Sequence, residues 1–442
     1  MNYHTPITDA LLDGAVRIVR TLRNAGHQAL FAGGCVRDRL LGRPIHDYDI
    51  ATSARPDDVE SLFRKTIPVG KSFGVIVVLV GNDQYQVATF RSDGPYLDGR
   101  HPSSVTFSDA KSDVERRDFT INALLYDPLN DELLDHVGGR KDLEARLIRA
   151  VGDPRARFDE DKLRMMRAVR FTGQLGFALD SATEAAIREM APQVLQTSWE
   201  RIRDELGKLL VCDGRSEALD LLHRTSLLKV ILPEVAAMEG VGQPPEFHPE
   251  GDVWVHTKLA MKSLKSPSFI VALSTLLHDV GKPPTFVNAD RIRFNQHDKV
   301  GAKMSREIGE RFKLSNDEVE ELVWIVDRHL VFLGWPNLRQ ATLKKLFANP
   351  WFDHLVEVVR ADTLGSMATD DYVAEILAAR AAIPPEQIKP ARLVTGNDLI
   401  AMGHAPGPKF KEILEEAFDA QLEGRLTTHE QALDWVRSAY PV

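Results

Sequence analysis

Cysteine is almost absent from this sequence, because the 442 residues include only Cys35 and Cys212. Two isolated cysteines exclude a disulfide framework and a cysteine-based zinc knuckle. No apolar run approaches the ~18 residues of a transmembrane helix, and the N-terminus lacks the basic and apolar pattern of a signal sequence. We therefore expect a cytoplasmic protein without a membrane partner.

Basic residues are fewer than acidic ones. The sequence contains 55 lysines and arginines and 64 aspartates and glutamates, which gives a formal net charge of −9. This excess of negative charge argues against a protein coated in nucleic acid. It does not exclude an RNA ligand, because a local basic surface is what contacts phosphates. The length is too great for one hydrophobic core and predicts several domains.

Hydrophobic periodicity divides the chain into a mixed front part and a helical remainder. Helices are predicted over residues 5–26 and 56–63, where apolar positions or an acidic first turn follow helical spacing. Two strand-like runs, 75–80 and 85–90, flank a turn at Gly81. Strand signals nearly vanish after the first third of the chain. The pattern predicts an α+β chain, with a small mixed α/β unit followed by helices.

The stretch 31–52 reads F-A-G-G-C-V-R-D-R-L-L-G-R-P-I-H-D-Y-D-I-A-T. Gly33 and Gly34 allow the backbone to approach a triphosphate closely, and the N–H groups of the helix start beside them favour anions. Arg37 and Arg43 would add charge-matched phosphate contacts. Together these residues predict a phosphate-binding turn.

Two aspartates follow this turn closely. If Tyr48 lies on a strand, Asp47 and Asp49 point to one face of it. Carboxylates so placed can hold two Mg²⁺ ions for attack by a hydroxyl and release of pyrophosphate. A glycine turn with solvated aspartates is the alternative interpretation.

Residues 116–124 read R-R-D-F-T-I-N-A-L. The adjacent arginines Arg116 and Arg117 can hold the phosphates or ribose of a nucleotide, while a following helix packs through Ile121 and Leu124. A helix start with a solvated basic pair is the alternative.

The string 159–171 predicts a helix on which Asp161 and Arg164, three residues apart, share one face. A carboxylate acceptor beside a guanidinium donor can imitate the Watson–Crick edge of a base, and so select a nucleotide without a template. The alternative is a surface ion pair worth ~0.3–0.5 kcal/mol.

The second half of the chain carries histidines and aspartates suited to a metal: His256, His278, Asp279, His297, His329 and Asp362. His278 and Asp279 follow an apolar helical run, so both can meet one metal from a helix end. Imidazole nitrogen and carboxylate oxygen suit Mg²⁺, Mn²⁺ or a transition metal such as Ni²⁺. Taken singly, such histidines are more often structural.

Five motifs between residues 31 and 208 resemble, in order, those of the class II tRNA nucleotidyltransferase and bacterial poly(A) polymerase family. They are GGxVRDxLLG…DxD, the string at 116–124, a glycine pair at 138–139, EDxxR with RAxRF at 160–171, and E-R-I-R-D-E-L-G-K at 200–208. The resemblance implies a polymerase-beta-like head in which Asp47 and Asp49 are catalytic and hold Mg²⁺. It implies nucleotide binding by Gly33, Gly34, Arg37, Arg117, Asp161, Arg164, Arg167 and Arg170.

Residues 91–107 are rich in turn residues, and by composition form an exposed loop. They resemble the family's flexible loop, with Arg91, Asp98 and Arg100 at matching positions. In the family this loop accompanies addition of the terminal adenosine. One departure is Gln86, which stands where relatives often carry glutamate, so a third metal carboxylate must be absent or come from elsewhere.

The order H…HD…H…H…D and the string HDxGK resemble the HD phosphohydrolase superfamily. The resemblance implies metal ligation by His256, His278, Asp279 and Asp362. It implies a second metal position or phosphate contact for His297 and His329, and a phosphate contact for Lys282. Some HD-bearing tRNA nucleotidyltransferases hydrolyse 2′,3′-cyclic phosphates and phosphomonoesters. A domain kept for structure or RNA contact is the alternative.

The combined hypothesis is template-independent addition of CCA to the tRNA 3′ end from CTP and ATP, by two-metal nucleotidyl transfer and without an obligate protein partner. Alternatives are an enzyme that adds only adenosine, a poly(A) polymerase, or mainly an HD phosphohydrolase with an RNA-binding head. Four domains are expected: a head with an N-terminal helix at 1–149, a neck and body at 150–245, an HD domain at 246–365 and a helical tail at 366–442.

Overall fold

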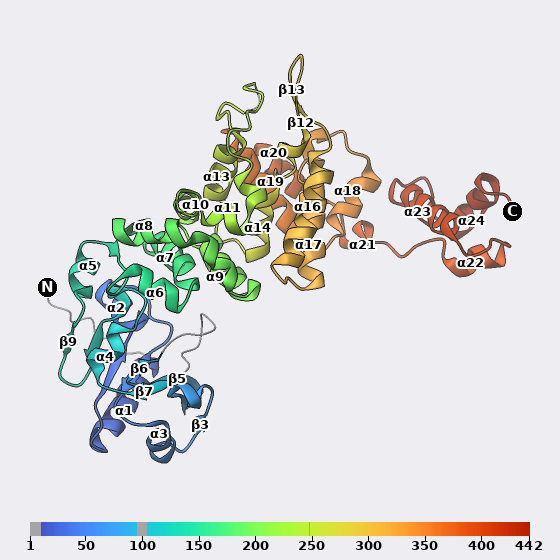
Figure 1. The fold of residues 1–442 in the computed structure, drawn as a ribbon. Coiled ribbons are helices and arrows are strands. Elements are labelled where there is room, and N and C mark those ends of the chain that lie inside the picture. Colours follow the sequence, from blue (N-terminus) through green and yellow to red (C-terminus); the bar gives the residue numbers. More distant parts are fainter. Residues whose placement is uncertain (1–9, 95–103, 247) are drawn as a thin grey trace. The chain divides into compact units, whose positions relative to one another are not determined.

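The computed structural model describes residues 10–94, 104–246 and 248–442. The chain forms two compact units, one ending at Ala236 and one beginning at Ala237 (Figure 1). This division is coarser than the four expected domains, whose inner boundaries stay a prediction. A mixed sheet lies in the first unit and helices dominate the rest, as the sequence pattern predicted.

The N-terminal part of the first unit contains a seven-stranded sheet with the strand order β3-β4-β5-β2-β1-β8-β9. β2 and β5 pair in parallel, and the other neighbours pair antiparallel. The strands are β1 (Ala29–Ala32), β2 (Asp49–Thr52), β3 (Thr66–Ile67), β4 (Val75–Val80), β5 (Asp83–Thr89), β8 (Leu125–Asp127) and β9 (Glu132–Leu134). The two predicted strands of the central hairpin are confirmed as β4 and β5.

Short helices cover this sheet: α1 (Ala10–Asn24), α2 (Gly34–Leu40), α3 (Pro56–Leu62), α4 (Ala110–Glu115) and α5 (Gly139–Glu144). The apolar stripe of α1, including Ile18 and Leu22, is fully buried, because these residues recur every turn on the face toward the sheet. The Tyr85 hydroxyl on β5 donates to the carbonyl of Leu11, 2.9 Å away. Gly42 ends α2 in the left-handed conformation, with φ 66°, as its position predicted.

Two local predictions are wrong. Tyr48 precedes β2 rather than lying on it, and its ring packs 5.0 Å from that of Phe31. The helix predicted across 159–171 is interrupted at Asp161, which has φ −146° and ψ 106° and separates α6 (Pro154–Glu160) from α7 (Leu163–Leu175). Asp161 is the residue that ends α6, and its carboxylate accepts a hydrogen bond at 3.1 Å from the amide of Leu163, the first residue of α7.

Helices complete the first unit: α8 (Ser181–Met190), α9 (Trp199–Val211), α10 (Arg215–Arg224), α11 (Leu227–Ile231) and α12 (Pro233–Ala236). α7 packs against α10 at Gly173, where an added Cβ would lie 2.8 Å from that of Ala218. A buried ion pair between Arg170 and Glu205 joins α7 to α9. Only a 3₁₀ turn at Thr120–Asn122 follows the arginine pair, where a helix was predicted, although Ile121 and Leu124 are buried as expected.

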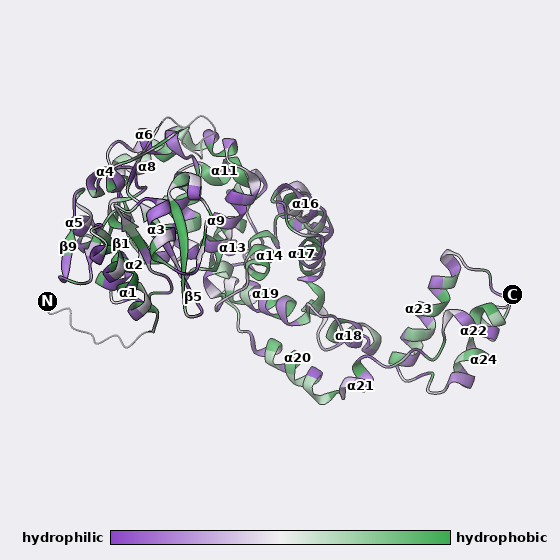
Figure 2. Cartoon of the chain, turned by 90° about the horizontal axis from the view of Figure 1, so that it is seen from below, coloured by the Kyte–Doolittle hydropathy of each residue, from purple (hydrophilic) through white to green (hydrophobic). Residues whose placement is uncertain are grey.

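The second unit is helical. Its first helices are α13 (Val253–Ser263), α14 (Phe269–Leu277), α15 (Lys282–Thr285), α16 (His297–Arg311), α17 (Asn316–Arg328), α18 (Gln340–Phe347) and α19 (Phe352–Gly365). α14 is buried along its length and coloured as hydrophobic in Figure 2. The remaining helices are α20 (Asp371–Ala382), α21 (Pro385–Ile388), α22 (Gly396–Ala401), α23 (Pro408–Leu422) and α24 (His429–Ala439).

The last three helices share a hydrophobic core of their own, which includes Val394, Leu399, Ile413 and Val436. Among the described residues, three short strand pairs lie outside the main sheet: β6 (Arg91–Asp93) with β7 (Val105–Phe107), β10 (Leu147–Ile148) with β11 (Ala178–Leu179), and β12 (Phe286–Asn288) with β13 (Ile292–Phe294). Across the described part of the chain, every helix is too short or too polar to span a lipid bilayer.

Candidate active sites

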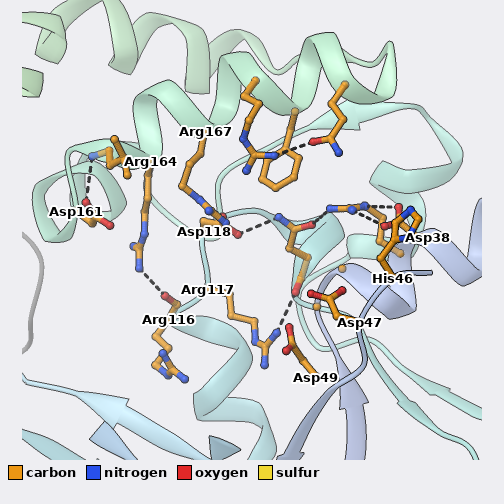
Figure 3. Close-up of a pocket in the computed structure, with 18 of the residues that line it drawn as sticks. Asp38, His46, Asp47, Asp49, Arg116, Arg117, Asp118, Asp161, Arg164 and Arg167 are labelled. Atoms are coloured by element: carbon orange, nitrogen blue, oxygen red, sulfur yellow. Dashed lines mark hydrogen bonds and ion pairs between the residues drawn. The ribbon is translucent and has the colours of Figure 1, made fainter. Parts of the chain in front are cut away.

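A cavity of about 600 Å³ opens in the first unit between β2, α2 and the helices α7 and α9 (Figure 3). All ten predicted head residues line it: Gly33, Gly34, Arg37, Asp47, Asp49, Arg117, Asp161, Arg164, Arg167 and Arg170. Residues up to 137 positions apart in the chain therefore meet at one site, as the order of motifs predicted.

Gly33 forms the narrowest wall of this cavity. Its φ of 76° lies in the left-handed region. An added Cβ would lie 3.3 Å from the Arg117 guanidinium and 3.8 Å from Asp49 Oδ2. A side chain here would strain the backbone and also crowd both charged groups, so the position requires glycine.

Charge is concentrated in the cavity. Among the described residues, seven arginines and five aspartates line it. Three aspartates are each engaged by an arginine: Asp38 by Arg37 at 2.7 Å, Asp118 by Arg167 at 2.6 Å and Asp161 by Arg201 at 2.8 Å. Within the described part of the chain, Asp47 and Asp49 are the two lining aspartates that form no ion pair.

Asp47 and Asp49 lie together beside Arg117 (Figure 3). Burial and the neighbouring carboxylate of Asp47 raise the pKa of Asp49 to about 6, against the opposing effect of Arg117. Two close carboxylates that repel each other are stabilised by a cation, and hard oxygen ligands suit Mg²⁺. The donor set therefore fits the divalent metal implied by the sequence.

The arginines near Asp47 and Asp49 form hydrogen bonds and ion pairs with other groups of the protein. Arg117 donates to Asp113 at 3.0 Å and to the Asn122 carbonyl at 3.2 Å. Burial alone would raise the pKa of Asp118, but the guanidinium of Arg167 holds it at about 2. These pairs fix the direction of each guanidinium before any ligand binds.

Asp161 and Arg164 do not pair with each other, so the alternative of a surface ion pair between them is wrong. Arg164 donates instead to Glu160 at 2.6 Å and to the Arg116 carbonyl at 3.1 Å. The prediction that Asp161 and Arg164 share one helix face is also wrong, because the backbone is extended at Asp161. Both side chains nevertheless line the cavity.

Sequence reasoning missed four supporting residues: Asp118, Asn122, Arg201 and Glu205. Glu205 carried a detectable signal, because it lies in phase with the buried residues Ile202, Leu206 and Leu209 of α9. A charged residue on an apolar helix face predicts a buried partner. Here that partner is Arg170. The side chains of Arg170 and Glu205 are only 8% and 5% exposed to solvent, respectively.

Two further expectations concern β5 and the loop that follows it. Gln86 is exposed on β5 and does not line the cavity, so no third carboxylate comes from this position. Arg91 begins β6 and pairs with Asp93 at 2.8 Å. Asp98 and Arg100, the other predicted loop residues, lie outside the described residues.

A second cluster lies in the second unit and contains the predicted histidines and aspartates. It comprises two adjoining groups: His256, His278 and Asp362, and Asp279, His297 and His329. His278 Nε2 of the first group lies 3.2 Å from Asp279 Oδ2 of the second. The ligand atoms are 2.9 Å apart between His256 and Asp362, and 3.3 Å apart between His297 and Asp279. Ligands of one divalent ion with bonds near 2.1 Å lie roughly 3–3.5 Å from each other, so the spacing fits metal binding.

The histidine rings are oriented by the backbone. The Nδ1 atoms of His278, His297 and His329 lie 2.7, 2.9 and 2.8 Å from the carbonyls of Thr275, Phe294 and Val326. This contact places the proton on Nδ1 and leaves Nε2 as the ligand atom. Burial and His278 lower the pKa of His329 to about 4, and its buried Nε2 has no hydrogen-bond partner among the described residues.

Lys282 is buried and contacts Asp279 at 2.6 Å and Gln243 at 2.5 Å. Its ammonium therefore compensates a carboxylate of the cluster. Beside these residues is a cavity of about 680 Å³ with a wall of apolar and aromatic side chains, including Phe294, Phe332, Trp335 and Tyr372.

Three known families match parts of this chain. The "Poly A polymerase head domain" matches residues 29–149, the "Probable RNA and SrmB- binding site of polymerase A" matches residues 176–239, and the "HD domain" matches residues 252–364. The first stretch contains Gly33, Gly34, Asp47 and Asp49 of the first cavity, the second contains helix α9, and the third contains the histidine cluster.

Relatives of known name resemble the chain over nearly its whole length. The CCA-adding enzyme of Geobacillus thermodenitrificans (strain NG80-2) is 37% identical over 426 residues, which are 95% of each chain. That of Bacillus subtilis (strain 168) is 32% identical over 432 residues, covering 96% of this chain and 97% of the relative.

Solved structures agree. The CCA-adding enzyme of Bacillus stearothermophilus in complex with CTP superposes with a TM-score of 0.75 at 32% identity, over 98% of this chain and 99% of that one. The Thermotoga maritima CCA-adding enzyme complexed with tRNA has the same fold, with a TM-score of 0.57 at 20% identity over 98% of this chain and 96% of that one.

The geometry of Gly33 predicts a selective effect of alanine. Gly33→Ala and Gly42→Ala both place alanine at a positive φ, which should lower the free energy of unfolding by about 1–2 kcal/mol for Gly42→Ala and by more for Gly33→Ala, because the ψ of −133° at Gly33 lies outside the left-handed α region. Only Gly33→Ala crowds Arg117 and Asp49, since nothing lies within 4 Å of a Cβ at Gly42. Both variants should therefore unfold at lower urea concentrations than the wild type, but only Gly33→Ala should also bind a nucleoside triphosphate more weakly. Equal affinity in both variants would contradict the tight fit at Gly33.

Proposed function

The chain belongs to the family of CCA-adding enzymes, and we propose that its first unit adds the terminal CCA to tRNA from CTP and ATP with the residues of the first cavity. The names of the relatives favour this activity over addition of adenosine alone, over poly(A) synthesis and over a chain that acts mainly as a phosphohydrolase. The observation that carries the residue assignment is the isolation of Asp47 and Asp49 from the arginine pairs of the cavity. The cytoplasmic location predicted from the sequence stays a prediction.

In the proposed reaction the tRNA 3′-hydroxyl attacks the α-phosphate of the bound nucleotide, and the bond to pyrophosphate breaks. Asp47 and Asp49 would hold divalent ions, Mg²⁺ in our proposal, which lower the pKa of the attacking hydroxyl and neutralise the phosphates when bound. Arg117 is placed beside this pair and would contact the triphosphate. Gly33 and Gly34 leave room for the phosphates against the backbone.

Base selection falls to Asp161 and Arg164 in this proposal. Both line the cavity on the side of α7, away from Asp47 and Asp49 (Figure 3). Carboxylate oxygens accept from the amino groups of cytosine and adenine, and guanidinium N–H groups donate to ring nitrogens or carbonyls. Arg167, held by Asp118, and Arg170, held by Glu205, would orient the nucleotide.

We further propose that the histidine cluster of the second unit is a metal-dependent phosphohydrolase centre. His256, His278 and Asp362 would hold one divalent ion and Asp279, His297 and His329 a second, with Asp279 between them. Its carboxylate offers Oδ2 to His278 at 3.2 Å and Oδ1 to His297 at 3.3 Å. Mg²⁺, Mn²⁺ and Ni²⁺ all suit this donor set, and phosphomonoesters and 2′,3′-cyclic phosphates are the proposed substrates.

Extension of a tRNA transcript that lacks its 3′ CCA tests the first activity. We expect two cytidines from CTP alone, and one further adenosine when ATP is also present. Adenosine added only to a tRNA that already ends in CC would contradict full CCA addition, and long adenosine tracts would indicate poly(A) synthesis. Denaturing gel analysis at single-nucleotide resolution distinguishes these products.

Two variants separate the two sites. Asp49→Ala removes a proposed metal ligand of the head and should lower the rate of incorporation by roughly 1,000-fold, because several kcal/mol of charge stabilisation are lost. Hydrolysis of a phosphomonoester by the same variant should stay near that of the wild type. Asp279→Ala should have the opposite effects. Incorporation by Asp49→Ala at the rate of the wild type would refute the metal assignment.

A further inference from the structure

Both oxygens of the Asp161 carboxylate accept a hydrogen bond. Its Oδ1 accepts from the Leu163 amide at 3.1 Å, and its Oδ2 accepts from the Arg201 guanidinium at 2.8 Å. A carboxylate with a fixed donor on each oxygen cannot rotate about its last bond without breaking one of them. Its remaining lone pairs therefore point in set directions.

Arg201 comes from α9 and lines the same cavity. The helix that carries it is anchored, because Glu205, one turn further along, pairs with Arg170 of α7 in the buried interior. A guanidinium on an anchored helix is a more precise support than one on a loop. Arg203 of the same helix pairs instead with its neighbour Asp204, at 2.8 Å.

The orientation of Asp161 decides which base edge it can accept. Cytosine and adenine each carry an exocyclic amino group, whereas uracil and guanine carry a carbonyl oxygen at the corresponding position. A fixed carboxylate accepts from an amino group and repels a carbonyl oxygen. A carboxylate free to turn aside, or to let water bridge the gap, loses that repulsion.

We propose that Arg201 is a specificity-determining positioning residue that acts through Asp161 to select CTP and ATP against UTP and GTP. The proposal rests on the proposed function of Asp161 as a reader of the base. Arg201 orients the carboxylate of Asp161, which accepts from the base. Arg164 does not take part in this contact, because it donates to Glu160 and to the Arg116 carbonyl.

The test compares incorporation of CTP and UTP into a tRNA transcript that ends before CCA. Arg201→Ala should raise the KM for CTP and lower the ratio of kcat/KM for CTP to that for UTP by about 10-fold, the effect of one oriented charged hydrogen bond. The kcat with CTP should change by less than about threefold, since Arg201 does not act at the reacting atoms. Arg201→Lys should restore part of the discrimination, and Arg203→Ala is the matched control.

The variant Asp161→Ala, measured in parallel, distinguishes base recognition by Asp161 from the positioning role of Arg201. If Asp161→Ala loses discrimination but Arg201→Ala keeps it, Asp161 reads the base without help and this proposal is overturned. If Asp161→Ala itself keeps discrimination, the proposed function of Asp161 fails, and the role of Arg201 fails with it. Because Arg201→Lys keeps charge and fold, its intermediate value is informative even where Arg201→Ala is unstable in urea.

A separate observation concerns Glu250, whose side chain is fully buried beside the histidine cluster. Its Oε1 forms a hydrogen bond with His248 Nδ1 at 2.9 Å, and it lies 2.8 Å from His256 Nδ1 in a charge contact that lacks hydrogen-bond alignment. On the opposite side of its ring, His256 Nε2 lies 2.9 Å from Asp362. The other three histidines face backbone carbonyls with Nδ1, so among the described residues of the cluster His256 alone has a carboxylate there.

We propose that Glu250 is a positioning residue for the metal centre: its negative charge beside His256 Nδ1 favours the proton on that nitrogen and leaves Nε2 as a metal ligand. A carboxylate behind a ligating imidazole raises its basicity, and loss of such a partner typically costs 10–100-fold in metal affinity. This proposal rests on the proposed metal centre. The competing role for Glu250 is direct ligation of a further ion together with His248 and His256, which form a third compact group.

Mn²⁺ titration of the full chain, with bound metal counted by equilibrium dialysis, tests the role of Glu250. Glu250→Gln should weaken Mn²⁺ binding about 10-fold or more with unchanged stoichiometry, and should alter the electron paramagnetic resonance spectrum of bound Mn²⁺. Glu246→Gln, an exposed glutamate on the same segment, is the control. Unchanged affinity would overturn the proposal, and so would loss of one ion with full affinity for the rest, which indicates direct ligation. Equal Mn²⁺ uptake by wild type and Asp279→Ala would instead overturn the metal centre itself.

Discussion

The head of this protein depends on the pairing of arginines with buried carboxylates. Seven described arginines converge on one cavity, and such a cluster would repel itself if each charge were left alone. Arg37, Arg167, Arg170 and Arg201 each contact a carboxylate, and those carboxylates come from different segments of the first unit. Removing one partner of a buried pair costs far more than the pair contributes, so these contacts also fix which helices can pack together. The position of α9 against α7 follows from this constraint as much as from apolar contacts.

The same pairing separates the groups that hold structure from those left for chemistry. In the described part of the cavity, Asp47 and Asp49 are the aspartates that no arginine satisfies, and burial together with their mutual repulsion raises the pKa of Asp49 to about 6. In the second unit, backbone carbonyls satisfy the Nδ1 atoms and leave the Nε2 atoms facing Asp279 and Asp362. In the head, the residues proposed to hold metal are those that no arginine satisfies, whereas in the second unit they are buried groups that contact mainly one another and Lys282.

Local pattern was sufficient for most of the fold. The strand-like runs of β4 and β5, the cap at Gly42 and the apolar run of α14 are decided by residues close in sequence, and these elements were predicted. The break at Asp161 was not, because helical spacing continues through it and only the capping of Leu163 and the pull of Arg201 favour the extended backbone. All ten head residues were predicted through their motifs, whereas Arg201 and Asp118 were missed, since their roles arise from contacts 40 and 49 positions away in the sequence.

Net charge was the least informative property of this sequence. A total of −9 describes the whole surface, whereas an anionic ligand meets only the potential at its site. Lining arginines outnumber lining aspartates in the first cavity, and three of those aspartates are already engaged by guanidinium groups. Arginine suits this arrangement better than lysine, because one planar guanidinium can donate to a carboxylate and still present further N–H groups to a phosphate or a base. An acidic chain can therefore build an arginine-rich active site, because the carboxylates that stabilise its arginines hold them in place, some within the cavity wall and one, Glu205, outside the lining.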